Sequence, residues 1–416
     1  MSRTVPFRSK VFPALPNVRG LIVYSILQGL YVGYIQIFWQ HFLVTFGFTV
    51  ALIGVMEAAA GAAGVLPSFL QTIGGRFSDR IGRRTLILAG SASLVLCWSV
   101  ATTAFLFDLK DLIFLAYVLW SFSALGLTVI DSMMADNLPT EDRPRVYSIF
   151  LIGGFLPSSI TGYLVGVYSA ATGPQVFLAL AAVLEGIGFI ILFARLRETI
   201  PNSGERKSHP LDLREVFTSV RNHKGYFAVG ISDSLTWSIS TSILSATLTA
   251  ARHFSNFDFG ILTLSLPIGV VLGTLPGGWL AHRLGPRNLL ASSQLLGSLM
   301  MFGWAFFPIT GLVPLYGVVW GFSISTWVPV QFLVSSVTFP ELKRGELMGA
   351  YGTSRGLVRA AAPIVATVLF LEYGYSAPLV VGGVGVLLSI ILILRYVRND
   401  VGQDQSFEPI SQDRGS

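Results

Sequence analysis

Long apolar stretches, separated by short polar breaks, follow one another along nearly the whole chain of 416 residues. An α-helix needs roughly 20 residues to cross the hydrocarbon of a bilayer. Because lipid offers no hydrogen-bond partners to the backbone, helices are the expected form of such stretches. The sequence predicts twelve spans, at residues 20–45, 50–73, 85–107, 111–136, 145–168, 173–195, 225–250, 257–281, 288–308, 312–337, 346–371 and 375–396.

The composition supports a membrane protein and argues against other classes. Hydrophobic residues make up 52% of the chain and charged residues 12%, which is typical of a polytopic membrane protein. The net charge of +6 is spread over short loops, so nucleic-acid binding is not expected. Cys97 lies in an apolar stretch and is expected to be a buried core residue. The sequence has neither an ATP-binding loop nor a catalytic constellation, so we expect no enzyme, no metal and no cofactor.

The distribution of Lys and Arg predicts the sidedness of the chain. These residues are concentrated in the N-terminal arm, in the loop after the second span and in the central linker, whereas the opposite loops contain only Lys110 and Arg252. The positive-inside rule therefore places both termini in the cytoplasm. The predicted organisation is an N-terminal arm (1–19), a six-helix bundle (20–195), a linker (196–223), a second six-helix bundle (224–397) and a disordered tail (398–416). Within the linker, residues 211–217 form either a short interfacial helix or plain linker.

One motif occurs twice. The first copy runs from Gly74 to Arg84, and a weaker copy runs from Gly277 to Arg287. A second pair of similar loops, around Pro139 and Pro340, has nearly the same offset along the chain. The pairs indicate that a unit of six spans was duplicated. Repeats of this kind place a substrate site where the two halves meet.

The pattern Gly-x-x-x-Asp-Arg-x-Gly-Arg-Arg, in the loop between the second and third spans, resembles the signature of the major facilitator superfamily. The resemblance implies the fold of that family, an all-α membrane protein with twelve transmembrane helices in two parallel-related six-helix bundles. It also implies a secondary transporter that works by alternating access. In such a protein, spans 1, 2, 4, 5, 7, 8, 10 and 11 line a central cavity.

The resemblance further implies a gating latch at the cytoplasmic end. Asp79 would face the positive N-terminus of span eleven, and Arg83 would connect Asp79 to an acid at the end of span four. The latch residues are Gly75, Asp79, Arg80, Gly82, Arg83 and Asp136, with Asp131 as the alternate acid. The alternative is that the arginines only anchor the topology. In the second copy, His282 and Pro286 replace Asp79 and Arg83, so we expect a weaker or neutral latch there.

Charged residues inside predicted spans mark candidate functional sites, because they are expensive in hydrocarbon. They are Glu57, Glu185, Asp233, Arg355 and Arg359. All except Glu185 lie on spans that line the cavity in the family, so these four are the stronger candidates. We expect Arg355 or Arg359 to bind an anionic group of a substrate. The alternative is a permanent pairing with Glu57, Asp233 or backbone carbonyls. Glu57 and Asp233 are the candidates for proton coupling, because a carboxyl group binds a proton more readily in apolar surroundings than beside an arginine.

Aromatic and amide side chains on the same spans complete the candidate substrate site. Helical spacing places them in stripes along spans one, seven and ten. Besides the two arginines, the predicted substrate-binding residues are Tyr24, Gln28, Tyr31, Trp237, Trp320, Trp327 and Gln331. Together they predict a cavity with aromatic walls, amide groups and two guanidinium groups.

The expected function is secondary active transport of a small organic solute, with an anionic solute suggested by the arginines and with protons as the coupling ion. The expected partners are the solute, protons and the lipid bilayer, and the expected form is a monomer in the inner cell membrane. One alternative is an efflux antiporter for multiple drugs or amphipathic compounds, although span four lacks an arginine before Gly126. A second alternative, from another class, is a membrane sensor or scaffold that no longer transports.

Overall fold

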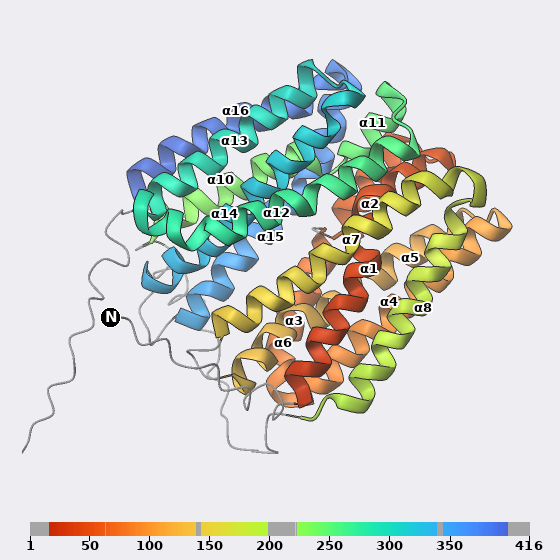
Figure 1. Cartoon of the computed structure of the whole chain (residues 1–416), viewed down its shortest axis with the longest axis horizontal. Helices are drawn as coiled ribbons and strands as arrows, with labels where there is room; N and C mark the ends of the chain where they lie inside the picture. Colours follow the sequence, from red (N-terminus) through yellow and green to blue (C-terminus); the bar gives the residue numbers. More distant parts are fainter. Residues whose placement is uncertain are drawn as a thin grey trace, which may run out of the picture.

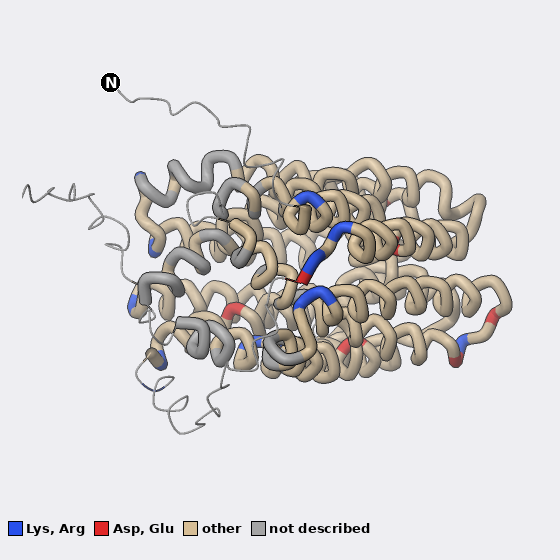
Figure 2. Tube along the Cα trace, turned by 90° about the horizontal axis from the view of Figure 1, so that it is seen from below, with Lys and Arg blue, Asp and Glu red and all other residues tan. Residues whose placement is uncertain are grey.

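A computed structural model of the chain describes residues 16–62, 64–138, 143–198, 221, 223–338 and 344–397, which are helices and short turns with no strand. The expected interfacial helix at 211–217 and the expected disordered tail at 398–416 lie outside these residues. Long stretches of the trace carry no Lys, Arg, Asp or Glu (Figure 2), as spans within lipid require.

The described residues of the first half form eight helices. They are α1 (Pro16–Thr45), α2 (Val50–Ala60), α3 (Val65–Ile81), α4 (Arg83–Phe107), α5 (Asp111–Phe122), α6 (Ala124–Asn137), α7 (Arg143–Thr172) and α8 (Pro174–Arg195). The second half forms α10 (Lys224–Thr241), α11 (Leu244–Arg252), α12 (Asn256–Leu284), α13 (Pro286–Phe306), a 3-10 turn η2 (Thr310–Leu312), α14 (Val313–Thr338), α15 (Arg344–Tyr373) and α16 (Ser376–Tyr396).

These helices make up twelve spans. Nine helical stretches in the described ranges are long and apolar enough to cross a bilayer, and the other three spans are α5 with α6, α7, and α10 with α11. The second, fourth and seventh spans are each broken into two helices, between Ala60 and Val65, at Ser123, and between Thr241 and Leu244. The prediction of an all-α membrane protein with twelve spans is confirmed. The breaks in these three spans were not predicted.

The two halves lie side by side as two groups with the same internal packing (Figure 1). In the N-terminal group α1 packs on α7, α3 on α6 and α4 on α8. The corresponding spans of the C-terminal group pack in the same way, α10 on α15, α12 on α14 and α13 on α16. This correspondence is what a duplication of six spans in the same direction would produce.

The groups meet along two seams. α7 packs against α12, and α2 packs against α15, with α1 touching α11 nearby. At the first seam, a Cβ atom added to Gly166 would lie 2.6 Å from the Cα atom of Gly260. Only glycine allows two helix backbones to come this close. The seam between α7 and α12 is therefore a direct contact of two backbones.

We name the end of the bundle where α1 begins and α16 ends the terminal end, and the opposite end the far end. α2 and α11 lie together at the far end (Figure 1). Four hydrogen bonds join the two groups there, from Gln40 and His41 near the end of α1 to α11, the start of α12 and the break before α11. The structure thus has its far side closed.

The duplicated motif forms a tight joint between helices and not the loop that the sequence suggested. α3 continues to Ile81, so the segment from Gly74 to Arg80 is helical. Gly82 then joins α3 to α4 with a φ of 99°, and Gly285 joins α12 to α13 with a φ of 76°. These values favour glycine. Both copies of the motif therefore build the same joint, one in each half.

Candidate functional site

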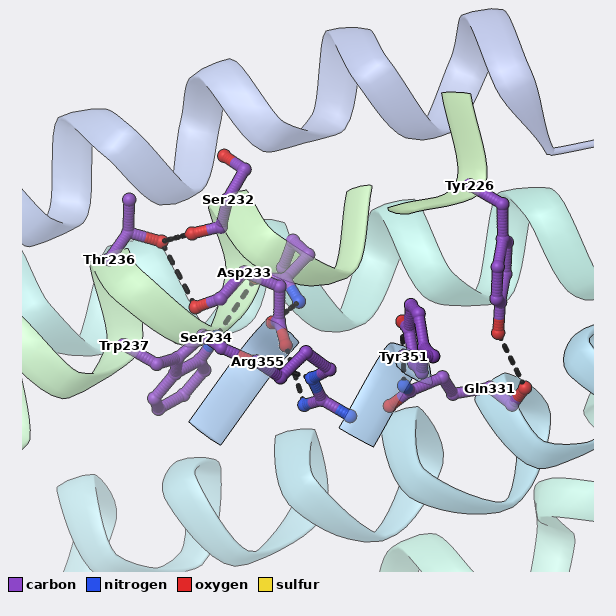
Figure 3. A network of polar contacts seen from close by, with 10 residues as sticks. Tyr226, Ser232, Asp233, Ser234, Thr236, Trp237, Gln331, Tyr351 and Arg355 are labelled. Atoms are coloured by element: carbon purple, nitrogen blue, oxygen red, sulfur yellow. Dashed lines mark hydrogen bonds and ion pairs between the residues drawn. The ribbon is translucent and has the colours of Figure 1, made fainter. Parts of the chain in front are cut away.

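The C-terminal group contains an ion pair at the middle of its spans. Asp233 on α10 is only 4% exposed, and its Oδ2 atom lies 3.3 Å from Nη2 of Arg355 on α15. The Nε atom of Arg355 also donates a hydrogen bond of 2.5 Å to the Ser234 hydroxyl (Figure 3). A charge without a partner is expensive inside a membrane. Their pairing explains how two charged residues are accommodated in apolar spans.

Asp233 has a second partner on a peripheral span. Nε2 of Gln294 on α13 donates to Oδ1 of Asp233 at 2.8 Å, and Nε1 of Trp237 donates to Oε1 of Gln294 at 2.9 Å. Both carboxylate oxygens of Asp233 are therefore occupied. Gln294 was not predicted from the sequence, although an amide in the interior of a mostly apolar span is a signal that could have found it.

Arg359 lies one helical turn beyond Arg355 on α15, and its side chain is exposed. Its charge interacts with those of Asp233 and Arg355. Within the described ranges, however, its guanidinium group makes no hydrogen bond and no ion pair. Of the two arginines that the sequence selected, Arg355 is paired with Asp233, and Arg359 is exposed.

Tyr351 and Gln331 lie beside Arg355, on its side toward the terminal end of the bundle, where α15 begins. Nε2 of Gln331 donates to the Tyr351 hydroxyl at 2.8 Å, and the Tyr226 hydroxyl donates to the main-chain carbonyl of Gln331 at 3.0 Å. The rings of Tyr226 and Tyr351 stack with their centroids 4.9 Å apart. The Arg355 guanidinium lies 5.4 Å from the centroid of the Tyr351 ring, within the range of a cation–π contact. Figure 3 shows Gln331 joined to both tyrosines, through its main-chain carbonyl to Tyr226 and through its side chain to Tyr351.

The three candidate tryptophans pack into the protein. Trp327 is buried in a cluster with Phe227 and Leu290, while Trp237 and Trp320 are partly buried against the main hydrophobic core. The aromatic walls expected from the sequence are thus largely part of the core. Trp237 still contacts the ion-pair network through Gln294.

A cavity of about 160 Å³ lies between α1 and α7 in the N-terminal group. It is lined by Ser25, Gln28, Gly29, Val32, Gly33, Gln36, Phe150, Gly154 and Phe155. Gln28, a predicted substrate residue, is among them. The lining combines an apolar surface with two side-chain amides, which suits a solute with both apolar and polar parts.

Tyr24 and Tyr31 do not line this cavity. They are 3% and 0% exposed, and their hydroxyl groups donate to the Glu185 carboxylate on α8 at 2.8 and 2.6 Å. Ser91 on α4 donates to the same carboxylate. The tyrosines therefore face α8 and not the cavity. Glu185 is satisfied by three hydroxyl groups.

Glu57 belongs to a separate network near the far end. Its Oε1 atom accepts hydrogen bonds from Nε2 of Gln40 at 3.2 Å and from the Tyr117 hydroxyl at 2.9 Å. In the described part of the chain it has no ion pair. The two candidates for proton coupling therefore lie in different groups and have different partners. Glu57 lies in the N-terminal group, and Asp233 lies in the C-terminal group.

The latch residues are described only in part. Arg83 is buried, and its Nη1 atom donates to the main-chain carbonyl of Ser132 on α6 at 2.7 Å. Glu198, which the sequence analysis missed, accepts from the backbone N–H groups of Arg83 and Arg84, both at 3.1 Å, and so caps the positive end of α4. The side chains of Asp79, Arg80, Asp131, Asp136 and His282, and the packing around Gly75, lie outside the described residues.

Comparisons with known proteins agree with this architecture. A family model described as Major Facilitator Superfamily matches residues 21–232 and 226–414. The enterobactin exporter EntS of Citrobacter koseri is 24% identical over 294 residues, which cover 67% of this chain and 68% of that protein. The class E tetracycline resistance protein of Escherichia coli is 22% identical over 344 residues, 77% of this chain and 80% of that protein.

A solved structure shares the fold. The crystal structure of the human organic anion transporter MFSD10 superposes with a TM-score of 0.66 at 17% sequence identity, over 91% of this chain and 99% of that chain.

Proposed function

The chain belongs to the major facilitator superfamily of multi-pass membrane transporters, and on this premise we propose that it moves a small organic solute with an anionic group by alternating access, driven by protons. Family membership makes the protein a transporter and not an enzyme. The solute, the direction of transport and the proton coupling are the parts that we propose.

The observation that carries the proposal is the Arg359 guanidinium group, which is exposed and has no partner among the described residues. A guanidinium group offers several N–H donors in a plane, which suits a carboxylate or a phosphate. A permanent positive charge in a span is expensive, so an anionic solute would stabilise it. We assign Gln28 as a second contact to the same solute. Its amide lies in the N-terminal half, in the cavity between α1 and α7.

The pair of Asp233 and Arg355 supplies a way to couple the solute to a proton. Arg355 can pair with the Asp233 carboxylate, as here, or with an anionic solute. When Asp233 takes up a proton, its attraction for Arg355 falls, and Arg355 becomes free to join Arg359 on the solute. Proton binding and solute binding would then favour the same state of the site.

The remaining parts of the cycle follow from the closed far side. We propose that both termini are cytoplasmic, so that this structure is the state closed to the outside. Glu57, near the far end, is proposed as the second proton-binding residue. Asp79, Arg83 and Asp136, with Gly75, Arg80 and Gly82 shaping the joint, would form the latch that closes the cytoplasmic side in the opposite state.

Export of amphipathic compounds is the second candidate. It is favoured by the cavity between α1 and α7, whose lining includes Val32, Phe150 and Phe155 beside the amides. Two relatives, an enterobactin exporter and a tetracycline resistance protein, point in the same direction. In this case Arg359 would serve amphipathic compounds that carry a negative charge.

Transport into liposomes tests the proposal. The purified protein is reconstituted and given a panel of anionic, neutral and cationic solutes of similar size, with and without a pH gradient. We expect anionic solutes to be accumulated, and a pH gradient to increase that accumulation. Equal transport of neutral analogues would contradict the role of Arg359. Binding of every solute without translocation would instead indicate a sensor.

A further inference from the structure

The break in span seven is occupied by a side chain from the other half. α10 ends at Thr241 and α11 begins at Leu244. In a continuous helix the N–H group of Ala246 would donate to the carbonyl of Ser242, four residues earlier. That bond is not among those formed in the described part of the chain. Instead, both groups are bound by Gln40 of α1, whose Nε2 atom donates to the Ser242 carbonyl at 2.5 Å and whose Oε1 atom accepts from the Ala246 N–H at 3.4 Å.

The Gln40 amide thus stands in the place of one backbone hydrogen bond. A side chain inserted between an N–H group and the carbonyl four residues before it is a recognised cause of helix breaks. No proline and no glycine occurs between Ser240 and Ala246, so the local sequence does not itself demand a break here.

Glu57 fixes the orientation of this amide. Gln40 is 8% exposed, and its Nε2 atom also donates to Oε1 of Glu57 at 3.2 Å. The two donor hydrogens and the acceptor oxygen of the amide are therefore all used. With the carboxylate on the N-terminal group as an acceptor, the NH₂ side of the amide is the one that faces Ser242, and the oxygen faces Ala246.

We propose that Gln40 is a positioning residue for alternating access, and that its amide holds span seven broken while the far side is closed. When α1 moves away from α11, Gln40 leaves the break, Ser242 and Ala246 pair with each other, and span seven becomes one continuous helix. This inference rests on the proposed transport cycle only in requiring that the far side opens. It does not depend on the solute or on the coupling ion.

The exchange would keep the Ser242 carbonyl and the Ala246 N–H group paired in both states. In the closed state Gln40 satisfies Ser242 and Ala246, and in the open state they satisfy each other. Buried backbone groups that lose a partner destabilise a membrane protein strongly, so a change that keeps them paired can proceed with a small difference in free energy. A simple tether would differ from this, since it would tie α1 to α11 without altering the helix, as the neighbouring His41 does through Thr249.

Distances between paired spin labels can separate these two roles. The only cysteine, Cys97, is buried, and Cys97→Ser provides the background. One pair, Phe107→Cys with Ile309→Cys, uses exposed positions at the far end of the two groups. The other pair, Lys224→Cys with Ala250→Cys, uses exposed positions on either side of the break in span seven. The full chain is measured in lipid nanodiscs without solute, by double electron–electron resonance.

Gln40→Leu is the test variant, because leucine has a similar size and no hydrogen-bonding groups. We expect it to lengthen the far-end distance and to move the span-seven distance toward about 39 Å, the Cα separation for a continuous helix at 1.5 Å per residue. Gln40→Glu, which cannot donate to Ser242 when ionised, is expected to shift both distances in the same direction. The matched control is Gln175→Leu at the start of α8, where the amide donates only to the nearby Thr172 carbonyl.

The proposal is overturned if the far-end distance lengthens while the span-seven distance stays as in the parent protein, because Gln40 would then be only a tether. It is also overturned if both Gln40 variants match Gln175→Leu at both pairs. Since no solute is present, neither outcome depends on whether the proposed anionic solute is correct.

Discussion

The Oδ2 atom of Asp233 lies 3.3 Å from Nη2 of Arg355, so an acid of α10 and a base of α15 neutralise each other within one half of the molecule. Gln294 holds the other carboxylate oxygen, and Ser234 holds the guanidinium group at Nε. Because both helices belong to the C-terminal group, this pair can break or form without separating the two groups. In the proposed cycle, the pair would therefore respond to a proton or a solute without a movement between the two groups.

Replacing Asp233 by Asn should destabilise the protein, because it leaves Arg355 without a counter-charge. The loss should be about 1–3 kcal/mol, less than for a fully buried pair, since the Arg355 side chain is 25% exposed. Thermal unfolding in detergent measures the change. The double variant Asp233→Asn with Arg355→Gln should recover part of the loss. If the loss of stability in the double variant equals the sum of the losses in the two single variants, the two residues do not stabilise each other.

The need for this pairing could be read from the sequence, but the exact partners could not. Charges inside spans must be compensated, and this left Glu57, Asp233 or carbonyls as partners for the arginines. Choosing Asp233 requires the packing of α10 on α15. The contacts of Tyr24 and Tyr31 with Glu185 could not be predicted for a similar reason. A stripe on span one does not say which neighbour it faces, and α1 packs on both α7 and α8.

The fold itself was largely predictable, except where tertiary contacts override local sequence. Apolar length alone predicts the spans, and the repeated motif predicts the duplication. The break in span seven is bridged by Gln40, which is remote in sequence. The helical start of the motif before Gly82 was missed because polar residues at the end of a span look like a loop, although helices readily extend beyond the hydrocarbon.

The contact of α7 with α12 gives a prediction with a close control. Gly166→Ala should destabilise the state with the far side closed by about 1–3 kcal/mol, because its Cβ atom would lie 2.6 Å from the Cα atom of Gly260. Neither backbone can move away without disturbing the seam. Gly186→Ala should be neutral, since no atom lies within 4 Å of the added Cβ. Equal melting temperatures for the two variants would mean that the seam is looser than described.

Glu57→Gln tests the second proton-binding residue. The amide oxygen can still accept from Gln40 and Tyr117, so the variant should fold and bind solute, yet it cannot take up a proton. We expect accumulation driven by a pH gradient to fall to the level seen without a gradient, while exchange of solute across the membrane continues. Glu372→Gln, at an exposed position near the end of α15, is the control. Unchanged accumulation in Glu57→Gln would remove this residue from the coupling.

The two copies of the duplicated motif should differ in importance. Asp79→Asn should impair transport far more than His282→Asn, because a carboxylate can pair with Arg83 and with a helix N-terminus and a neutral side chain cannot. Initial rates of uptake in liposomes, corrected for the amount of protein inserted, provide the comparison. Similar rates for both variants would show that the first copy acts only as a topological anchor.

The central claim is that Arg359 binds the anionic group of the solute, and uptake by Arg359 variants tests it most directly. Initial rates are measured for an anionic solute accepted by the parent protein and for its neutral analogue, with Arg395→Gln on α16 as a control for the loss of an exposed arginine. We predict that Arg359→Gln lowers kcat/KM for the anion by about tenfold or more, equivalent to at least about 1.4 kcal/mol, and that Arg359→Lys retains part of it. Uptake of the anion by Arg359→Gln at the rate of the parent protein would contradict the account.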